Sequence, residues 1–259
     1  MPITPKNVSK ARRFWETAIP VLLFLGLWEA AARFGWVPGG FLLPPFSGVL
    51  LELGRLLADG TLVANVTPSL FRVLAGFLLG SGLGLIFGIA MGCSRLLDRS
   101  LTPIAALLYP IPALGWLPIF MLWFGIGETL PIAVIFVCCF FPVLYTTATG
   151  IRSVDEEYVN VARTLGAGRG EIVWRVLVPL ALPSIFTGLR LEAGMAWRVI
   201  IAAEMVAIPT GIGALLLRAE SILRLDTIIA CLFVLALLSF SFERFFAAWE
   251  RRLTRGWAL

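Results

Sequence analysis

Residues 129–150, TLPIAVIFVCCFFPVLYTTATG, contain no charged side chain and decide the fold class of this chain. A helix needs roughly 20 mainly apolar residues to cross a bilayer, and this run has that length. Further apolar runs predict five more spans, at about 17–35, 68–92, 101–124, 186–207 and 226–247. We therefore predict an all-α polytopic membrane protein with about six transmembrane helices, in a single transmembrane domain over residues 1–259.

The composition of the whole chain agrees with this class. Of its 259 residues, 59% are hydrophobic and 14% are charged, and the mean hydropathy is +0.93. A soluble domain of this size could not bury so much apolar surface. The net charge of +5 does not indicate nucleic-acid binding, because the basic residues lie in short loops and at the chain ends.

Several catalytic classes are excluded by residue usage. The chain has no histidine, and its lysines, Lys6 and Lys10, both lie in the N-terminal arm, so no phosphate-binding GxxxxGK[ST] loop exists. We expect no ATP hydrolysis and no cofactor in this chain. An intramembrane enzyme is disfavoured, because Ser81, Ser184 and Ser239 have no histidine or lysine to activate them. The cysteines, Cys93, Cys138, Cys139 and Cys231, lack CxxC spacing and are interpreted as small buried hydrophobic residues without a disulfide.

The loops predict the orientation in the membrane. The basic N-terminus and the following apolar run could be a signal peptide, but Glu29 makes a poor cleavage site, so an uncleaved first helix is favoured. If the N-terminus is cytoplasmic, the inner side holds Lys6, Lys10, Arg12, Arg13, Arg95, Arg99, Arg152, Arg163, Arg169, Arg175, Arg244, Arg251, Arg252 and Arg255. The outer side then holds Arg33, Arg55, Arg72, Arg218 and Arg224. This asymmetry predicts that both termini are cytoplasmic.

Two predicted helices carry unusual small or helix-breaking residues. The second has glycine at every fourth position, Gly76, Gly80, Gly84, Gly88 and Gly92, which predicts a groove where another helix approaches closely. The third contains the run YPIPALGWLP at 109–118. Its prolines predict a broken helix, either lining a substrate pathway or packing as a kinked element. Pro112 and Trp116 are therefore candidate pathway residues.

The fifth predicted helix carries four ionisable residues. At helical spacing Arg190, Arg198 and Glu204 share one stripe, and Glu192 points the other way. Ionisable groups at such depth face the bundle interior or a water-filled path. Arg198 and Glu204 are thus candidate pathway residues, with Arg198 attracting an anionic solute. The alternative is a structural ion pair between Arg198 and Glu192, Glu204 or an acid on another helix.

On the outer side, residues 36–67 predict an amphipathic helix after Pro44 and Pro45 that packs on the membrane face. Glu128 and the turn at 209–213 could contact a delivery protein or could be ordinary loop residues.

A long polar segment, NVARTLGAGRGEIVWRVLVP at 160–179, interrupts the apolar second half. Residues 155–165 predict a short helix capped by Asp155 or Ser153, followed by a turn at 166–170 and a second helix that Pro179 closes. In this segment Asn160, Val161 and Ala162 are followed by Gly166 after three residues and, nine residues later, by VLVP at 176–179.

This spacing resembles the EAA loop of the membrane subunits of bacterial ABC importers. The pattern of that loop is Glu-Ala-Ala, three residues, Gly, nine residues and Ile-x-Leu-Pro, from which Asn160 and Val161 depart. The segments LPPFSGVL, WLPIFMLWFGIGE, LPSIFTGLR and AAEMV extend the likeness from about Trp28 to Arg252. They are similar to permeases of the nitrate, sulfonate, taurine and bicarbonate group.

The resemblance implies a type I ABC importer permease in the bacterial inner membrane, which passes a small anionic solute of one of these types. The implied partners are a second copy of the chain, two cytoplasmic ABC ATPase subunits that hold ATP and Mg, and a periplasmic or lipid-anchored solute-binding protein. The loop at 151–180 would couple to the ATPase through Asn160, Val161, Ala162, Arg163, Leu165, Gly166 and Pro179.

Two alternatives remain open. One is the same role with a thiamine-precursor-like or other organic solute. The other is an ion-coupled secondary transporter, for which Glu192, Glu204 and the broken third helix would be suited.

Overall fold

The computed structural model describes residues 10–36 and 43–254, and this part of the chain is helical without strands. Its elements are α1 (Lys10–Arg33), α2 (Phe46–Ala58), α3 (Thr61–Cys93), α4 (Arg95–Leu108), the 3₁₀ turn η1 (Ala113–Trp116), α5 (Leu117–Phe124), α6 (Thr129–Arg152), α7 (Glu156–Thr164), α8 (Arg169–Ile172), the π-helical segment η2 (Val173–Leu177), α9 (Val178–Ala207), α10 (Ile212–Ser221) and α11 (Leu225–Thr254).

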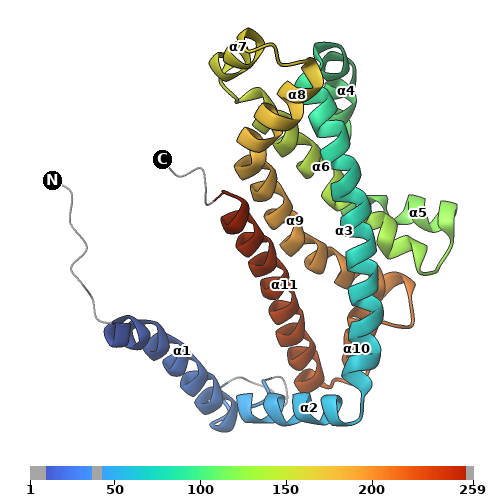
Figure 1. Ribbon diagram of the computed structural model, residues 1–259. Helices are drawn as coiled ribbons and strands as arrows, with labels where there is room; N and C mark the ends of the chain where they lie inside the picture. Colours follow the sequence, from blue (N-terminus) through green and yellow to red (C-terminus); the bar gives the residue numbers. More distant parts are fainter. Residues whose placement is uncertain (1–9, 37–42, 255–259) are drawn as a thin grey trace.

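The long helices α3, α6, α9 and α11 form the bundle (Figure 1). Four continuous helical stretches are long and apolar enough to cross a membrane, Thr61–Cys93, Thr129–Arg152, Arg169–Val206 and Leu225–Leu253. They contain four of the six predicted spans. The predicted third span is broken as its prolines indicated, because α4 and the η1–α5 segment meet at 85° and would form one further, bent span.

The first predicted span, 17–35, lies mostly in α1, which is not among these membrane-spanning candidates in the described residues. Its uncharged stretch between Glu16 and Glu29 is shorter than the roughly 20 residues of a bilayer span. Figure 1 shows α1 lying apart from the bundle and meeting it near α2. There Trp28 packs against Phe46 and Phe233, with ring centroids 5.6 and 6.1 Å away.

Close contact between α3 and α6 explains the glycines spaced four apart. A Cβ at Gly80 would lie 2.5 Å from the carbonyl oxygen of Phe136, and one at Gly84 would lie 2.7 Å from that of Phe140. Larger side chains would therefore push the two backbones apart. The predicted role of this stripe in helix packing is confirmed, and the packing is within one subunit.

The core lies where α3, α6, α9 and α11 meet. Val134, Ile135, Ala193, Ile200 and Cys231 are fully buried there. Ser184 of α9 sits over Gly150 of α6 in the same way that α6 sits over the glycines of α3.

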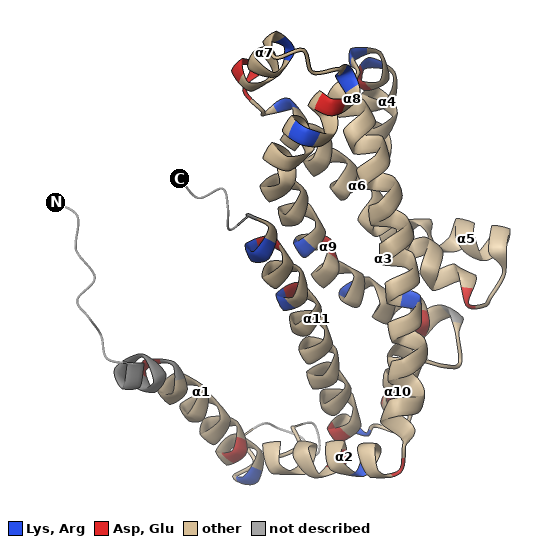
Figure 2. Ribbon diagram, viewed as in Figure 1, with Lys and Arg blue, Asp and Glu red and all other residues tan. Residues whose placement is uncertain are grey.

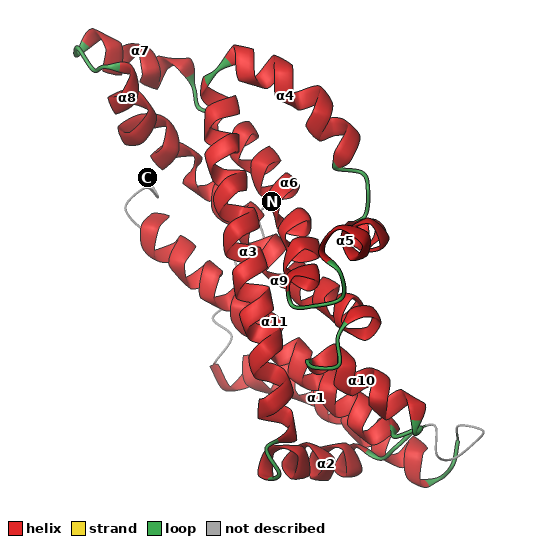
Figure 3. Ribbon diagram, turned by 90° about the vertical axis from the view of Figure 1, so that its right-hand side faces the viewer, coloured by secondary structure: helices red, strands yellow, loops and turns green. Residues whose placement is uncertain are grey.

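Charged residues gather at two ends of the bundle, around α7, α8 and the start of α4, and around α2 (Figure 2). Figure 3 shows α7 and the start of α4 together at one end and α2 and α10 at the other. Lys6 and Arg255, which entered the prediction of orientation, lie outside the described residues.

Candidate functional site

The predicted coupling segment forms a capped helix and a turn. Asp155 caps α7, since its Oδ1 accepts a hydrogen bond from the Glu157 amide at 3.0 Å. At the other end Gly166 has a φ of +82°, a conformation that favours glycine. The Ala167 amide donates to the Ala162 carbonyl at 3.0 Å, which closes the helix end. The predicted helix and cap are present, and the predicted turn at 166–170 is shorter, because α8 begins at Arg169.

The predicted end at Pro179 is wrong. After α8 the chain continues through the π-helical segment η2 into α9, and Pro179 lies in the first turn of α9. In the π turn the Val178 amide donates to the Val173 carbonyl, five residues earlier. Proline has no amide hydrogen to donate, and it is tolerated in the first turn of the α-helix that follows. The fifth long helix accordingly starts at Val178 and not after Pro183. A continuous helical stretch therefore runs from Arg169 to Val206.

The helix α7 has no buried residue and presents apolar side chains to its surroundings. Tyr158, Val161 and Leu165 are 58%, 60% and 82% exposed. Their spacing of three and four places them along one face. Val161 and Leu165 were predicted coupling residues. Tyr158 lies on the same face but was not among the predicted residues, although its spacing from Val161 is visible in the sequence.

Of the other predicted residues of this segment, Asn160 and Arg163 lie at a polar cleft and Ala162 is half-buried. Asn160 and Arg163 line a polar cleft of about 570 Å³ next to Arg95, Asp98 and Arg152. Arg163 donates to the Asn160 side chain at 3.3 Å. Asn160, which takes the place of glutamate in the EAA pattern, thus makes a local contact, and Ala162 is half-buried.

A second cavity lies beside the broken third helix. It measures about 400 Å³ and is lined from the break by Tyr109, Pro112 and Leu114, and across it by side chains of α6 and α9. Of the two candidate pathway residues in this helix, Pro112 lines the cavity. Trp116 does not line it, and its buried indole nitrogen has no hydrogen-bond partner among the described residues.

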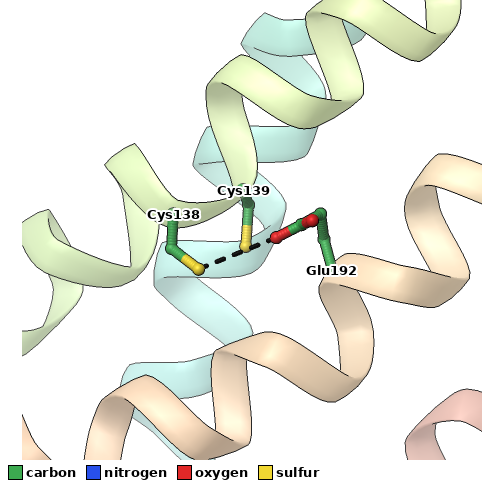
Figure 4. Close-up of side chains that lie close together, drawn as sticks. All are labelled: Cys138, Cys139 and Glu192. Atoms are coloured by element: carbon green, nitrogen blue, oxygen red, sulfur yellow. Dashed lines mark hydrogen bonds between the residues drawn. The ribbon is translucent and has the colours of Figure 1, made fainter. Parts of the chain in front are cut away.

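Two cysteines and one carboxylate meet beside this cavity, and of the three Cys138 and Glu192 line it (Figure 4). Cys138 and Cys139 project from α6 toward Glu192 of α9, and the Cys138 thiol lies 3.7 Å from the carboxylate. The two sulfurs and a carboxylate oxygen lie within 4.8 Å of one another, so this set could hold a metal ion. The prediction that all four cysteines are buried is wrong for Cys93, which ends α3 and is exposed. The cluster itself was missed, because Glu192 is distant in sequence from the adjacent Cys138 and Cys139.

The predicted stripe on α9 is divided between three environments. Arg198 is exposed and lines a separate cavity of about 390 Å³ between α9 and α11, together with Glu243. Its guanidinium donates to the Met195 sulfur at 3.6 Å and makes no ion pair within the described residues. Arg190 pairs with Glu250 at 3.5 Å. The expected ion pair of Arg198 with Glu192 or Glu204 is therefore not formed.

Glu204 is fully buried, and its partner is Arg72 of α3. Arg72 Nη1 donates to Glu204 Oε1 at 2.6 Å, and Ser69 donates to the same carboxylate at 2.8 Å. Arg72 was assigned to an outer loop in predicting the orientation, and this was wrong. The signal was present, because Arg72 is the one charged residue in the predicted span 68–92.

Arg72 also brings together the loop before α6 and the turn after α9. Its Nε and Nη2 donate to the Glu128 carboxylate at 2.5 and 2.6 Å, and Nη1 donates to the Thr210 carbonyl at 2.9 Å. The hydrogen bonds from Arg72 lower the pKa of Glu128. The turn is held from beneath by Glu204, which accepts from the Gly213 amide at 3.0 Å. Glu128, whose side chain is 61% exposed, and the 209–213 turn thus belong to one hydrogen-bonded network around the buried Arg72.

The sequence as a whole matches a protein family. Residues 80–255 match the family described as binding-protein-dependent transport system inner membrane component. A putative ABC transporter permease protein of Methanocaldococcus jannaschii is 39% identical over 78% of this chain and 74% of its own length. The taurine transport system permease protein of Escherichia coli is 35% identical, with 90% and 86% covered. The nitrate import permease protein of Synechococcus elongatus is 35% identical, with 94% and 91% covered.

Solved structures share the fold. A methionine ABC transporter in inward-facing conformations aligns over 72% of this chain and 95% of the solved chain, with a TM-score of 0.59 and 18% identity. An amino acid ABC transporter aligns over 77% and 97%, with a TM-score of 0.61 and 18% identity. The predicted type I importer fold is confirmed.

Proposed function

Because this chain belongs to the family of binding-protein-dependent transport system inner membrane components, we propose that it imports a small anionic solute across the bacterial inner membrane with energy from a separate ATPase. It is a multi-pass membrane protein and the permease subunit of an ABC transporter, which is not itself a catalytic subunit. The taurine and nitrate permeases among its relatives support a small solute with an acidic group.

The exposed face of α7 carries the proposal of an ATPase partner. An apolar stripe of Tyr158, Val161 and Leu165 on a short helix outside the bundle is suited to a groove on another protein. We assign to this contact the predicted set Asn160, Val161, Ala162, Arg163, Leu165, Gly166 and Pro179, within the coupling loop at 151–180. ATP and Mg are bound by the two ATPase subunits, and this chain holds no cofactor.

The remaining partners follow from the same role. Two copies of the chain, each one transmembrane domain over 1–259, enclose the solute path. A binding protein delivers the solute from outside. The Arg and Lys residues of the loops support cytoplasmic termini and a cytoplasmic α7. Pro112 and Arg198 line cavities and are proposed path residues, whereas Trp116 and Glu204 act from buried positions that support the path.

Reconstitution tests this function. The chain is co-expressed with the ATPase and binding protein encoded beside it and placed in proteoliposomes, and uptake of labelled taurine, an alkanesulfonate and nitrate is measured. Uptake that needs ATP and is blocked by vanadate is the expected result. Uptake that follows an ion gradient and ignores ATP would overturn the proposal in favour of a secondary transporter. A chain that never co-purifies with an ATPase would also contradict it.

A further inference from the structure

The carboxylate of Glu192 has no ionic partner although it is almost fully enclosed. Its residue is 7% exposed, and within the described residues its hydrogen-bond partner is the Cys138 thiol at 3.7 Å. A thiol is a weak donor, so most of the hydrogen-bonding capacity of the carboxylate is unused. A buried carboxylate without a cation or strong donors is costly, which points to a partner that arrives from outside the chain.

The cavity in front of Glu192 shows what kind of partner fits. Its described lining contains no lysine or arginine, and apart from Glu192, Cys138 and Tyr109 it is apolar. With about 400 Å³ it has the size of a small-molecule site. One carboxylate on an apolar wall is complementary to a small molecule with a protonated amine at one end and a short carbon stem. Nitrate and bicarbonate have neither feature.

We propose that Glu192 binds a protonated amino group of the transported solute in the cavity beside the broken third helix. The solute is then an amino-substituted small acid, such as an aminoalkanesulfonate, and not an inorganic anion. This inference rests on the proposed function, because the cavity matters for import only if it lies on the solute path.

The other occupant compatible with this cluster is a metal ion. Zinc ligands lie about 2.0–2.3 Å from the metal, and the donors of Cys138, Cys139 and Glu192, within 4.8 Å of one another, could converge on one. Such an ion would neutralise Glu192 and leave it unable to bind an amine. The two occupants make opposite predictions for the thiol of Cys139, which a metal needs and an amine does not.

Protection of Cys138 tests the amine site without requiring transport. A full-length variant keeps Cys138 and carries Cys93→Ser, Cys139→Ala and Cys231→Ala, and it is purified with its ATPase subunits. The rate at which N-ethylmaleimide alkylates Cys138 is measured with taurine, ethylammonium or ethanesulfonate present. We expect taurine and ethylammonium to slow alkylation and ethanesulfonate to have no effect. In the Glu192→Gln variant, the concentration of amine that gives the same protection of Cys138 should be about tenfold higher or more.

The carboxylate of Glu243 supplies the matched control. It also lines a cavity within the bundle, but a different one, so Glu243→Gln should leave the protection by amines unchanged. Equal protection by ethanesulfonate, or protection that survives Glu192→Gln, overturns the inference. Protection by Zn²⁺ in the protein that retains Cys139, with none by amines, identifies a metal site and overturns it as well.

Uptake separates this inference from the proposed function. In proteoliposomes the wild-type complex should import taurine. The Glu192→Gln variant should assemble with the ATPase as the wild type does, but its ratio of taurine uptake to ethanesulfonate uptake should be about tenfold lower. Import of ethanesulfonate but not taurine by the wild type leaves the importer role intact and refutes the amine site. If no solute is imported, the function fails, and the alkylation result still decides whether Glu192 binds amines.

Discussion

Arg72 and Glu204 form an ion pair in which both side chains are fully buried, with 2.6 Å between Nη1 and Oε1. The two residues are separated by more than half of the chain and join α3 to the end of α9. Through Glu128 and Thr210 the same guanidinium holds the loop that follows α5 and the turn that follows α9. This network ties α3 to the end of α9 and to the two segments.

Breaking the pair on one side should destabilise the protein strongly. Arg72→Met leaves the Glu204 carboxylate buried without its cation, and we expect a loss of about 3–5 kcal/mol in the free energy of unfolding. Thermal unfolding in detergent measures the effect. The double variant Arg72→Met with Glu204→Gln should lose less than the sum of the single variants. Additive losses would show that the two residues are not coupled.

The contact between Arg72 and Glu128 should depend on pH. Hydrogen bonds from Arg72 lower the pKa of Glu128 in the folded state, below an unfolded value of about 4.3. Its contribution to stability is therefore complete above the unfolded pKa and is lost as the pH falls through the folded pKa. The difference in unfolding temperature between wild type and Glu128→Gln should shrink below about pH 4.3. A difference independent of pH would contradict this assignment.

The stripe of glycines on α3 should tolerate no methyl group on the face toward α6. Gly80→Ala places a carbon 2.5 Å from the Phe136 carbonyl oxygen, and we expect a cost of about 1–3 kcal/mol from overpacking. Gly82 is the matched control on the same helix, since a Cβ there meets nothing within 4 Å. Gly82→Ala should be neutral or slightly stabilising. Equal losses in both variants would rule out close packing as the cause.

Gly166 should be needed for the shape of the coupling turn. Its φ of +82° makes Gly166→Ala cost about 1–2 kcal/mol locally, while the membrane bundle stays folded. We expect this variant to lower ATP-driven uptake more than the yield of folded permease. Gly168→Ala is the control, because Gly168 has a φ of −70° and open space around it. Wild-type uptake by Gly166→Ala would remove the turn from the coupling mechanism.

Much of the architecture follows from local sequence. The apolar run at 129–150 became α6, the prolines at 110–118 broke the third helix, and Asp155 capped α7. These outcomes depend on hydrophobic length, missing amide donors and capping, which act over a few residues. Pro179 was misjudged because a π turn two residues earlier, which no local rule indicated, carried the helix through it.

The partners of charged and thiol side chains could not be obtained in this way. Helical spacing correctly turned Glu192 away from Arg198 and Glu204, but it could not indicate that Glu204 meets Arg72 or that Glu192 meets Cys138. Local chain chemistry by itself determined a helical membrane protein with a capped polar segment between two long apolar helices. Tertiary packing alone decided which buried charges are paired and which cavity each side chain lines. Such pairings join residues from different helices, whose relative rotation is set by contacts such as those of Gly80 and Gly84 with α6.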